Sequence, residues 1–211
     1  MERESTPNEL TVLWEQRIKQ LGADFVFFVD ITALPREATD DYTCAVLFGK
    51  ALSKEYIRAV RDDLTPATKE IFNTERKMDA LAEKIAALLQ DEGYNSTGRL
   101  KTGKLPHKTV ALRAGLGFIG KNNLLVTEEY GCAVMLGKVL TAAPFTAVCT
   151  EPKKPECAGC TICTDCCRTG ALKGTTWSVT TTREQILTRK LCNLCHKCMV
   201  LCPYTEKYAN S

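Results

Sequence analysis

The chain has 211 residues, of which 45% are hydrophobic and 25% charged, close to the average for soluble globular proteins. This length suits one domain with a small appendage or two small domains. No apolar run reaches the roughly 18 residues that a transmembrane helix needs, and the N-terminus, MERESTPNEL, lacks the apolar core of a secretory signal. We therefore expect a cytoplasmic protein with no membrane partner.

The formal net charge of +3 counts every cysteine as neutral. Lys and Arg are scattered along the chain rather than gathered into one stripe, as a protein that follows a nucleic-acid backbone requires. The charge by itself therefore gives little support for nucleic-acid binding.

The first half of the chain predicts helices and buried strands in alternation. Apolar residues at helical spacing, with Pro7 at the start and Gly22 at the end, predict a helix over 7–21. Continuous apolar runs over 25–29 and 43–48 predict buried strands. A long helix is predicted over 66–91, with a buried stripe formed by Ile71, Met78, Leu81, Ile85 and Leu88.

A short helix is predicted over 108–114, followed by strands over 124–127 and 133–141. Residues 150–156, TEPKKPE, contain two prolines and no apolar side chain, which is typical of a linker or a rigid turn. We therefore predict two domains, at residues 1–150 and 151–211.

Twelve cysteines are the feature of the composition that departs from the average, and most of them lie between 157 and 202. Disulfides would explain this number in a small secreted protein. This chain is long and shows no secretory signal, so thiolates that bind metal in a reducing compartment are the better interpretation.

The cysteines repeat one pattern twice. The first run is C-x2-C-x2-C-x3-C over 157–167, and the second is the same pattern followed by proline over 192–203. This is the spacing of bacterial ferredoxins, in which the fourth cysteine of each run binds the cluster of the other run. The first cysteine group is then Cys157, Cys160, Cys163 and Cys202, and the second cysteine group is Cys192, Cys195, Cys198 and Cys167. We predict that each group binds one [4Fe–4S] cluster.

Zinc is the alternative metal, but its tetrahedral sites use pairs of C-x2-C turns and leave the third cysteine of each run unexplained. Two irregularities occur in the first run, where Arg168 replaces the proline and Cys166 precedes Cys167. The x3 spacing favours Cys167 as the ligand.

Three cysteines lie outside the runs. Cys44 and Cys132 fall in apolar segments and are expected to be buried, whereas Cys149, close to the linker, could be exposed. No role follows from the sequence for these three or for Cys166.

The segment RAGLGFIGKNNLL at 113–125, followed by LGKVLT at 136–141 and then by the two cysteine runs, resembles the signature of epoxyqueuosine reductases. Members of that family depend on cobalamin, and reductive dehalogenases share their architecture. The resemblance implies an α+β fold, in which a nitroreductase-like α/β sandwich domain is followed by a bacterial ferredoxin-like domain with two [4Fe–4S] clusters. It also implies a cobalamin on the first domain.

The chain departs from the family in two places. Family members carry a C-terminal extension after the second run, whereas this chain ends nine residues after Cys202. They also carry an aspartate, proposed as a proton donor, just before the glycine signature, where the corresponding segment of this chain, 105–109, reads LPHKT. His107 either takes the donor role, since imidazole titrates near neutral pH, or is a structural residue.

The glycine-rich segment contains Gly115, Gly117 and Gly120, a G-x-G-x-x-G pattern that is weak evidence for a dinucleotide because it follows a predicted helix rather than a strand. Close approach of the backbone to a corrin, or to a neighbouring strand, is the better interpretation. Lys121 either reaches a phosphate or carboxamide of the cofactor or is solvated.

The leading hypothesis is an oxidoreductase that passes single electrons through two clusters to a cobalamin or a substrate on the first domain. Its electron donor would be an external low-potential protein of the ferredoxin or flavodoxin type, and its substrate a tRNA, as in the family, or a small molecule. The alternative is a non-catalytic electron carrier that docks to a larger reductase.

Overall fold

The computed structural model describes residues 6–65, 68–98, 105–157 and 159–211. These residues form two compact units, each assembled from three stretches of chain. Unit 1 contains the residues up to Lys50, Glu75–Gly115 and Met135–Glu151, and unit 2 contains Ala51–Thr74, Leu116–Val134 and Pro152–Ser211. The chain last passes from unit 1 to unit 2 inside the predicted linker.

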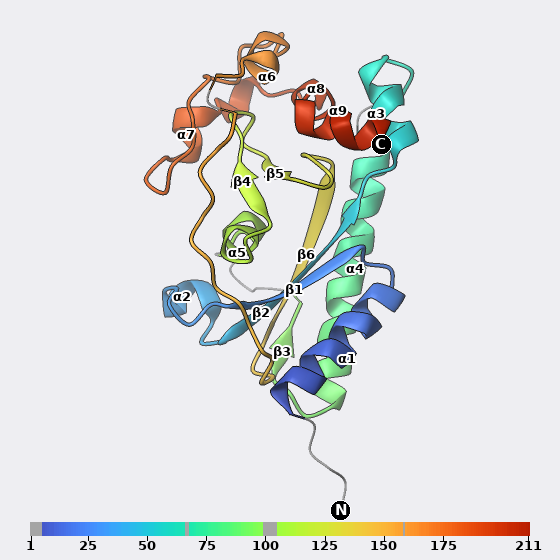
Figure 1. Ribbon diagram of the computed structural model, residues 1–211, viewed down its shortest axis with the longest axis vertical. Coiled ribbons are helices and arrows are strands. Elements are labelled where there is room, and N and C mark those ends of the chain that lie inside the picture. The colour runs from blue at the N-terminus through green and yellow to red at the C-terminus, as the bar shows by residue number, and fades with distance from the viewer. Residues whose placement is uncertain (1–5, 66–67, 99–104, 158) are drawn as a thin grey trace, which may run out of the picture. The chain divides into compact units, whose positions relative to one another are not determined.

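Unit 1 is built on a sheet. In the described part of the chain this sheet has four strands in the order β1-β2-β6-β3 (Figure 1). The strands are β1 (Phe25–Asp30), β2 (Cys44–Ala51), β3 (Ser96–Thr97) and β6 (Val134–Thr141). β1 pairs antiparallel with β2, and β3 pairs antiparallel with β6. The strands predicted over 25–29, 43–48 and 133–141 are thereby confirmed.

Two helices, α1 (Pro7–Gln20) and α4 (Lys69–Asp91), share one hydrophobic core with the sheet (Figure 1). The α1 helix begins at a capping box between Thr6 and Glu9, which satisfies backbone N–H groups of its first turn. Its residues Leu10, Trp14 and Ile18 are 0–6% exposed, because their spacing places them on one face. The predicted helix over 7–21 is confirmed.

The predicted start of the long helix at Pro66 lies outside the described residues. The inner stripe of α4 differs from the prediction at one position, because Leu89 is fully buried whereas Leu88 is only partly buried. A helix advances 100° per residue, so Leu88, one residue before Leu89, lies at the edge of the buried stripe.

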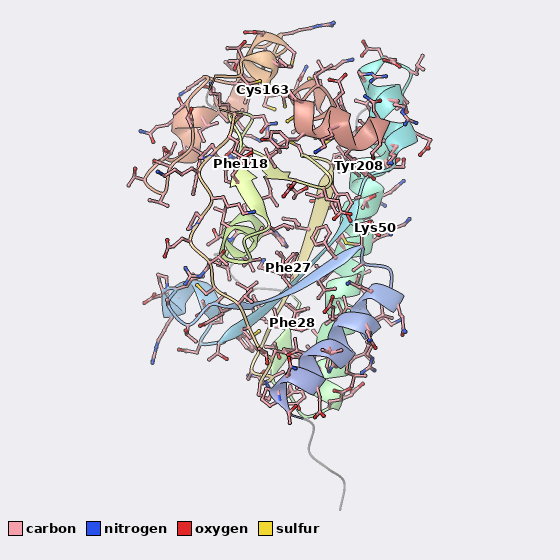
Figure 2. The ribbon with its side chains drawn as sticks, in the orientation of Figure 1. Phe27, Phe28, Lys50, Phe118, Cys163 and Tyr208 are labelled. Atoms are coloured by element: carbon pink, nitrogen blue, oxygen red, sulfur yellow. The ribbon has the colours of Figure 1, made fainter. Side chains whose placement is uncertain are left out.

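Consecutive residues of β1 face opposite sides of the sheet, as the pleat requires. Phe28 packs into the core with α1 and α4, where its ring lies 4.4 Å from that of Phe145. Phe27 points to the other side of the strand (Figure 2). The remaining helices of unit 1 are α2 (Arg36–Thr39) and α5 (His107–Arg113), and α5 confirms the helix predicted over 108–114.

Unit 2 contains short elements. A hairpin of β4 (Gly117–Ile119) and β5 (Leu125–Thr127) pairs Gly117 with Thr127. The helices are α3 (Lys54–Arg61), α6 (Ile162–Asp165), α7 (Arg183–Ile186), the 3₁₀ turn η1 (Arg189–Leu191), α8 (Lys197–Val200) and α9 (Pro203–Asn210). The strand predicted over 124–127 is confirmed as β5. The analysis of apolar periodicity predicted neither α3 nor β4.

Within the described residues, no helix has both the length and the apolar character needed to cross a membrane.

Candidate metal centre

A cavity of about 230 Å³ lies within unit 2. Water occupies about 30 Å³ per molecule in the liquid, so this space accommodates a group of many atoms. Its lining includes the side chains of the first cysteine group, Cys157, Cys160, Cys163 and Cys202. Three of these come from the first run, and Cys202 comes from the end of the second run, 39 positions after Cys163. The structure thus brings the predicted first group together around one cavity.

Cys202 is the N-cap residue of α9, a position where backbone N–H groups point at the side chain. A hydrogen bond from the Cys132 thiol is the largest influence on Cys202 and lowers its pKa to about 7, although burial opposes this. The N–H groups of Tyr204 and Thr205 act in the same direction. The surroundings of Cys202 therefore favour its thiolate form, which is the form that binds metal.

The second cysteine group lies around a small apolar cluster of unit 2. Cys163 of the first group and Cys167, Cys192 and Cys198 of the second pack against Ala171, Leu172 and Leu187. Burial, followed by the nearby cysteines Cys166, Cys195, Cys163 and Cys192, raises the pKa of the Cys198 thiol to about 12. Cys195 itself is exposed. Cysteines of the first run, Cys166 among them, thus lie close to cysteines of the second.

Cys166 and Cys167 differ in their surroundings. Burial alone would raise the pKa of Cys167, but hydrogen bonds from the Thr169 hydroxyl and from the N–H groups of Leu172 and Ala171 lower it below its ordinary value. Burial and the neighbouring cysteines raise the pKa of Cys166 to about 11, and its thiol donates to the Cys163 carbonyl at 3.4 Å. The surroundings therefore act in opposite directions, lowering the pKa of Cys167 and raising that of Cys166.

The second run folds tightly because two residues between its cysteines adopt left-handed backbone conformations. Leu194 has φ = 57° and His196 has φ = 56°, a region that side chains with a Cβ rarely occupy. The N–H of Cys195 donates to the Asn193 side chain at 3.3 Å, which fixes the turn. Burial lowers the pKa of His196 below its ordinary value.

Lys121 lies at the cavity, because its Nζ donates to the Cys160 carbonyl at 3.0 Å and the residue is only 8% exposed. The alternative that this lysine is solvated is therefore wrong. A buried ammonium beside a group of thiols favours negative charge in the cavity.

The glycines of the predicted cofactor segment each have a structural reason. Gly115 has φ = 69° and directly follows Ala114, the C-cap residue of α5, a position where glycine is favoured. Gly117 lies on β4, where a Cβ would collide with the Val126 backbone of β5. Gly120 lines the cavity. For Gly117, the close approach of a neighbouring strand is the interpretation that the structure supports.

His107 is the first residue of α5 in unit 1, and it is partly buried. Burial, and to a lesser extent the charge of Lys138, lowers its pKa to about 4. The ring is therefore neutral at pH 7, and an imidazolium that could donate a proton forms only in acid.

The structure adds residues that the cysteine pattern did not indicate. Asn122 donates to the Cys132 sulfur at 3.3 Å and to the Cys198 carbonyl at 2.9 Å. Tyr204 lines the cavity, packs edge-on against Phe118, and donates its hydroxyl to Glu156 at 2.6 Å. These contacts join residues far apart in sequence, so no local motif could have revealed them. As expected, Cys44 and Cys132 are buried and Cys149 is exposed.

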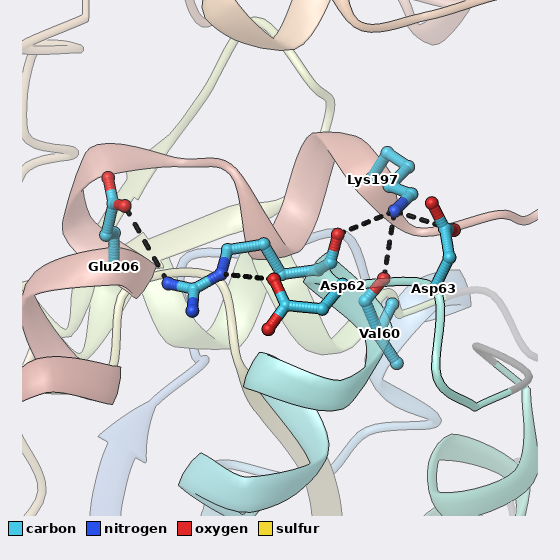
Figure 3. A network of polar contacts seen from close by, with 6 residues as sticks. Val60, Asp62, Asp63, Lys197 and Glu206 are labelled. Atoms are coloured by element: carbon cyan, nitrogen blue, oxygen red, sulfur yellow. Dashed lines mark hydrogen bonds and ion pairs between the residues drawn. The ribbon is translucent and has the colours of Figure 1, made fainter.

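A polar network anchors the second run to the end of α3 (Figure 3). The Lys197 ammonium, between Cys195 and Cys198 in sequence, donates to the carbonyls of Val60 and Arg61 at 3.0 and 2.9 Å. It also forms an ion pair with Asp63 at 2.8 Å. These carbonyls end a helix and have few intrahelical partners, so the lysine caps α3 from a distant part of the chain.

The described residues contain no group of three or more His, Cys, Asp or Glu side chains placed to hold a single metal ion. Fold and site together define a mixed α/β protein with two groups of cysteine side chains, of which the first lines a cavity.

Comparison with curated proteins finds relatives that are named epoxyqueuosine reductase. A protein named epoxyqueuosine reductase from Lactococcus garvieae is 37% identical over 147 residues, which are 62% of this chain and 40% of that protein. The match thus spans less than half the length of that curated relative. The resemblance to epoxyqueuosine reductases that the sequence predicts is confirmed. No model of a known protein family matches the chain.

Solved structures with similar folds belong to the same two groups of enzymes. An epoxyqueuosine reductase crystallised with an epoxyqueuosine-modified tRNA stem loop matches with a TM-score of 0.64 at 20% identity, covering 93% of this chain and 65% of that one. A reductive dehalogenase described as suggesting a mechanism for B12-dependent dehalogenation matches with a TM-score of 0.73 at 18% identity, covering 95% of this chain and 32% of that one. At these identities the likeness concerns the fold.

Proposed function

We propose that this chain is a one-electron redox protein similar to epoxyqueuosine reductases, with one [4Fe–4S] cluster in each cysteine group. The observation that carries the proposal is the cavity of about 230 Å³ lined by Cys157, Cys160, Cys163 and Cys202. Interleaved ferredoxin runs require this combination of three cysteines from one run and the last cysteine of the other.

The chemistry of the lining fits such a cluster. Thiolates are the protein ligands of [4Fe–4S] clusters, and the lining of the cavity contains four cysteines, one carboxylate residue, Glu156, and no histidine. The N–H groups of α9 and the Lys121 ammonium supply partial and full positive charge to a group that is anionic once bound. When bound, the clusters would supply one-electron transfer at potentials within the range of about −700 to +450 mV known for such centres.

The residues of the chain then have separate tasks. The first cysteine group would hold one cluster. The second cysteine group would hold the other cluster, with Cys167 rather than Cys166 as a ligand. Lys121 would orient the Cys160 loop, and Tyr204 with Phe118 would exclude water from one side of the cavity. We place the cysteine ligands in a ferredoxin-like domain at 151–211, which follows a nitroreductase-like domain at 1–150 in the sequence. The β4–β5 hairpin comes from the first of these ranges but is part of unit 2 with the cysteines.

The acceptor in this proposal is a cobalamin or a substrate on the nitroreductase-like domain. The names of the relatives and the reported B12 dependence of a dehalogenase with a similar fold support it. Of the residues that the resemblance assigns to this cofactor, Gly115 and Gly117 have the structural reasons given above, and Gly120 and Lys121 line the cysteine cavity. A tRNA substrate is supported by the stem loop in the solved reductase. In this proposal an external ferredoxin or flavodoxin donates the electrons, and the protein acts in the cytoplasm.

The second candidate function is that of a non-catalytic electron carrier. It is favoured by the state of His107, whose pKa of about 4 leaves it neutral at pH 7. A neutral imidazole is a poor acid, so a proton for a reduced substrate would have to come from water or from another group.

The test is anaerobic reconstitution with iron and sulfide, followed by titration with hydroxocobalamin. About eight iron and eight sulfide per chain, with an electron paramagnetic resonance signal typical of [4Fe–4S]⁺ after reduction, are expected for two clusters. Cys202→Ser should lose about half of the iron, whereas Cys149→Ser, at an exposed cysteine outside both groups, should lose none.

A change of the corrinoid spectrum to a base-off form at micromolar protein would support the enzyme, and its absence in the loaded protein would favour the carrier. Full iron content in the Cys202 variant would contradict the ligand assignment.

A further inference from the structure

The two cysteine groups differ in how far they reach the surface. All eight of their cysteines belong to the described part of the chain, and among them only Cys195, in the second group, is exposed. Electron transfer between proteins slows steeply with the distance between the two centres. A partner protein that contacts Cys195 would therefore lie close to a cluster held by the second group.

Apolar side chains lie on either side of this second run at the surface. Leu191 is 49% exposed and Leu194 is 37% exposed. Leu194 also has φ = 57°, a left-handed conformation that is costly for a residue with a Cβ. The first run has Gly159 at the equivalent position, and glycine adopts such a conformation without that cost. An exposed apolar side chain on a strained backbone, next to Cys195, indicates a surface that contacts another molecule.

The charged residues in front of these leucines are basic. Arg189 and Lys190 are exposed, and Arg189 donates to the Cys192 carbonyl at 3.3 Å, which holds it against the second run. From 189 to 202 the sequence contains no Asp or Glu. Lys197 forms an ion pair with Asp63 at 2.8 Å, so the positive charge that remains for a partner comes from Arg189 and Lys190. Such a surface is complementary to a partner with negative charge.

The composition of this surface favours a protein partner over a nucleic acid. Proteins that bind single-stranded nucleic acids stack the bases on aromatic side chains, and residues 178–203 contain no Phe, Trp or Tyr. Apolar side chains beside charged ones match the core and rim of a protein–protein interface. Complexes for electron transfer bury less than about 1,200 Å², so a few residues are enough to form one.

We propose that Arg189, Lys190, Leu191 and Leu194 form the docking surface for an acidic electron donor of the flavodoxin type. A flavin presents a hydrocarbon edge, the dimethylbenzene ring, which the two leucines can contact, and this favours a flavodoxin over a ferredoxin. In each encounter the reduced, anionic flavin loses one electron to the oxidised cluster of the second group, and no proton is transferred and no bond is formed or broken. This inference rests on the proposed function, because it requires that cluster to be present.

The test measures binding of an acidic flavodoxin to the reconstituted full chain, and the rate at which the reduced flavodoxin reduces it. Lys190→Glu should lower the association rate constant about tenfold at low ionic strength. The difference should disappear at about 1 M salt, where the screening length is about 3 Å. Lys154→Glu is the matched control, because it makes the same change of net charge at an exposed lysine in the linker.

The apolar part of the surface is tested separately. Leu194→Asn replaces the leucine by a residue that tolerates the left-handed backbone, and it should make dissociation of the flavodoxin about tenfold faster. Leu191→Gln is a second variant, outside the cysteine turn, with the same expected direction. In both variants the iron content and the reduction by dithionite, a small reductant that needs no docking surface, should equal those of the wild-type protein.

Cross-linking with a carbodiimide, which joins a lysine to a carboxylate, gives a further readout, and Lys190 should be joined to the flavodoxin. Unchanged binding in the Lys190 and leucine variants at full iron content would overturn the inference, as would an equal loss of binding in the Lys154 variant. Binding of an acidic ferredoxin but not of flavodoxin through these residues would overturn the choice of partner. An RNA stem loop that displaces flavodoxin from them would overturn a protein partner.

The same experiment separates this inference from the proposed function. If the chain assembles both clusters but does not bind flavodoxin, the docking surface is wrong and the proposed function stands. If the chain binds flavodoxin through these residues but assembles no cluster, the proposed function fails and the surface stands.

Discussion

Removing the Lys197 ammonium tests how the second cysteine run is held in place. In Lys197→Met the carbonyls of Val60 and Arg61 lose a charged donor. Hydrogen bonds that involve a charged group contribute about 1.5–3 kcal/mol each. The lysine side chain is 17% exposed, so the lower value applies, and two bonds amount to roughly 3 kcal/mol. Since about 1.4 kcal/mol is a factor of ten, the end of α3 should open about 100-fold more often.

Hydrogen–deuterium exchange of the reconstituted protein measures this opening directly. The amides of Asp62 and Leu64, which donate to carbonyls of α3, should exchange about 100-fold faster in the variant. Asp63→Asn should have a much smaller effect, because the Asp63 side chain is 73% exposed and water replaces the lysine as its partner. Lys190→Met, at an exposed lysine just before the second run, is the control. Unchanged exchange in α3, or an equal increase in the Lys190 variant, would refute the reasoning.

Three further predictions concern the fourth ligand, His107 and the hairpin. Cys167→Ser should lose about half of the bound iron, whereas Cys166→Ser should keep all of it; the reverse result would exchange their roles. The His107 pKa of about 4, against 6.5 in the unfolded chain, stabilises the fold by about 3 kcal/mol above pH 6.5. Because the unfolded chain binds the extra proton, this contribution is lost as the pH falls towards 4, and urea titrations should show no such loss in His107→Asn. Gly117→Ala should lower the urea midpoint by an amount equivalent to about 2–3 kcal/mol, because its Cβ would collide with the Val126 backbone; an unchanged midpoint would contradict that contact.

Much of unit 1 could be predicted from the sequence because its elements follow simple periodicities. The apolar run of β1 and the helical spacing of Leu10, Trp14 and Ile18 each indicate one element, and burial in a common core satisfies them. The α3 helix escaped prediction because it is short. Its buried residues Tyr56 and Ile57 show their helical pattern over little more than two turns.

The cysteine groups could be predicted because ligand spacing is a local property of the chain. The contacts around them could not, because they depend on how distant segments meet. Asn122 and Cys198 are 76 positions apart, and Cys132 and Thr205 are 73 apart. Lys121 gave no sign of burial either, since a lysine is usually solvated, and its hydrogen bond to the Cys160 carbonyl joins it to a residue 39 positions away.

The three-part assembly of unit 2 has a consequence for the order in which the protein matures. Its segments 51–74, 116–134 and 152–211 leave the ribosome one after another, yet the cavity has residues from the second and the third and includes Cys202. Joining such remote segments involves a large loss of chain entropy that local contacts cannot offset early. The proposed metal centre is therefore expected to form only after Cys202 has left the ribosome, so that cofactor delivery acts on a chain that has been synthesised at least that far.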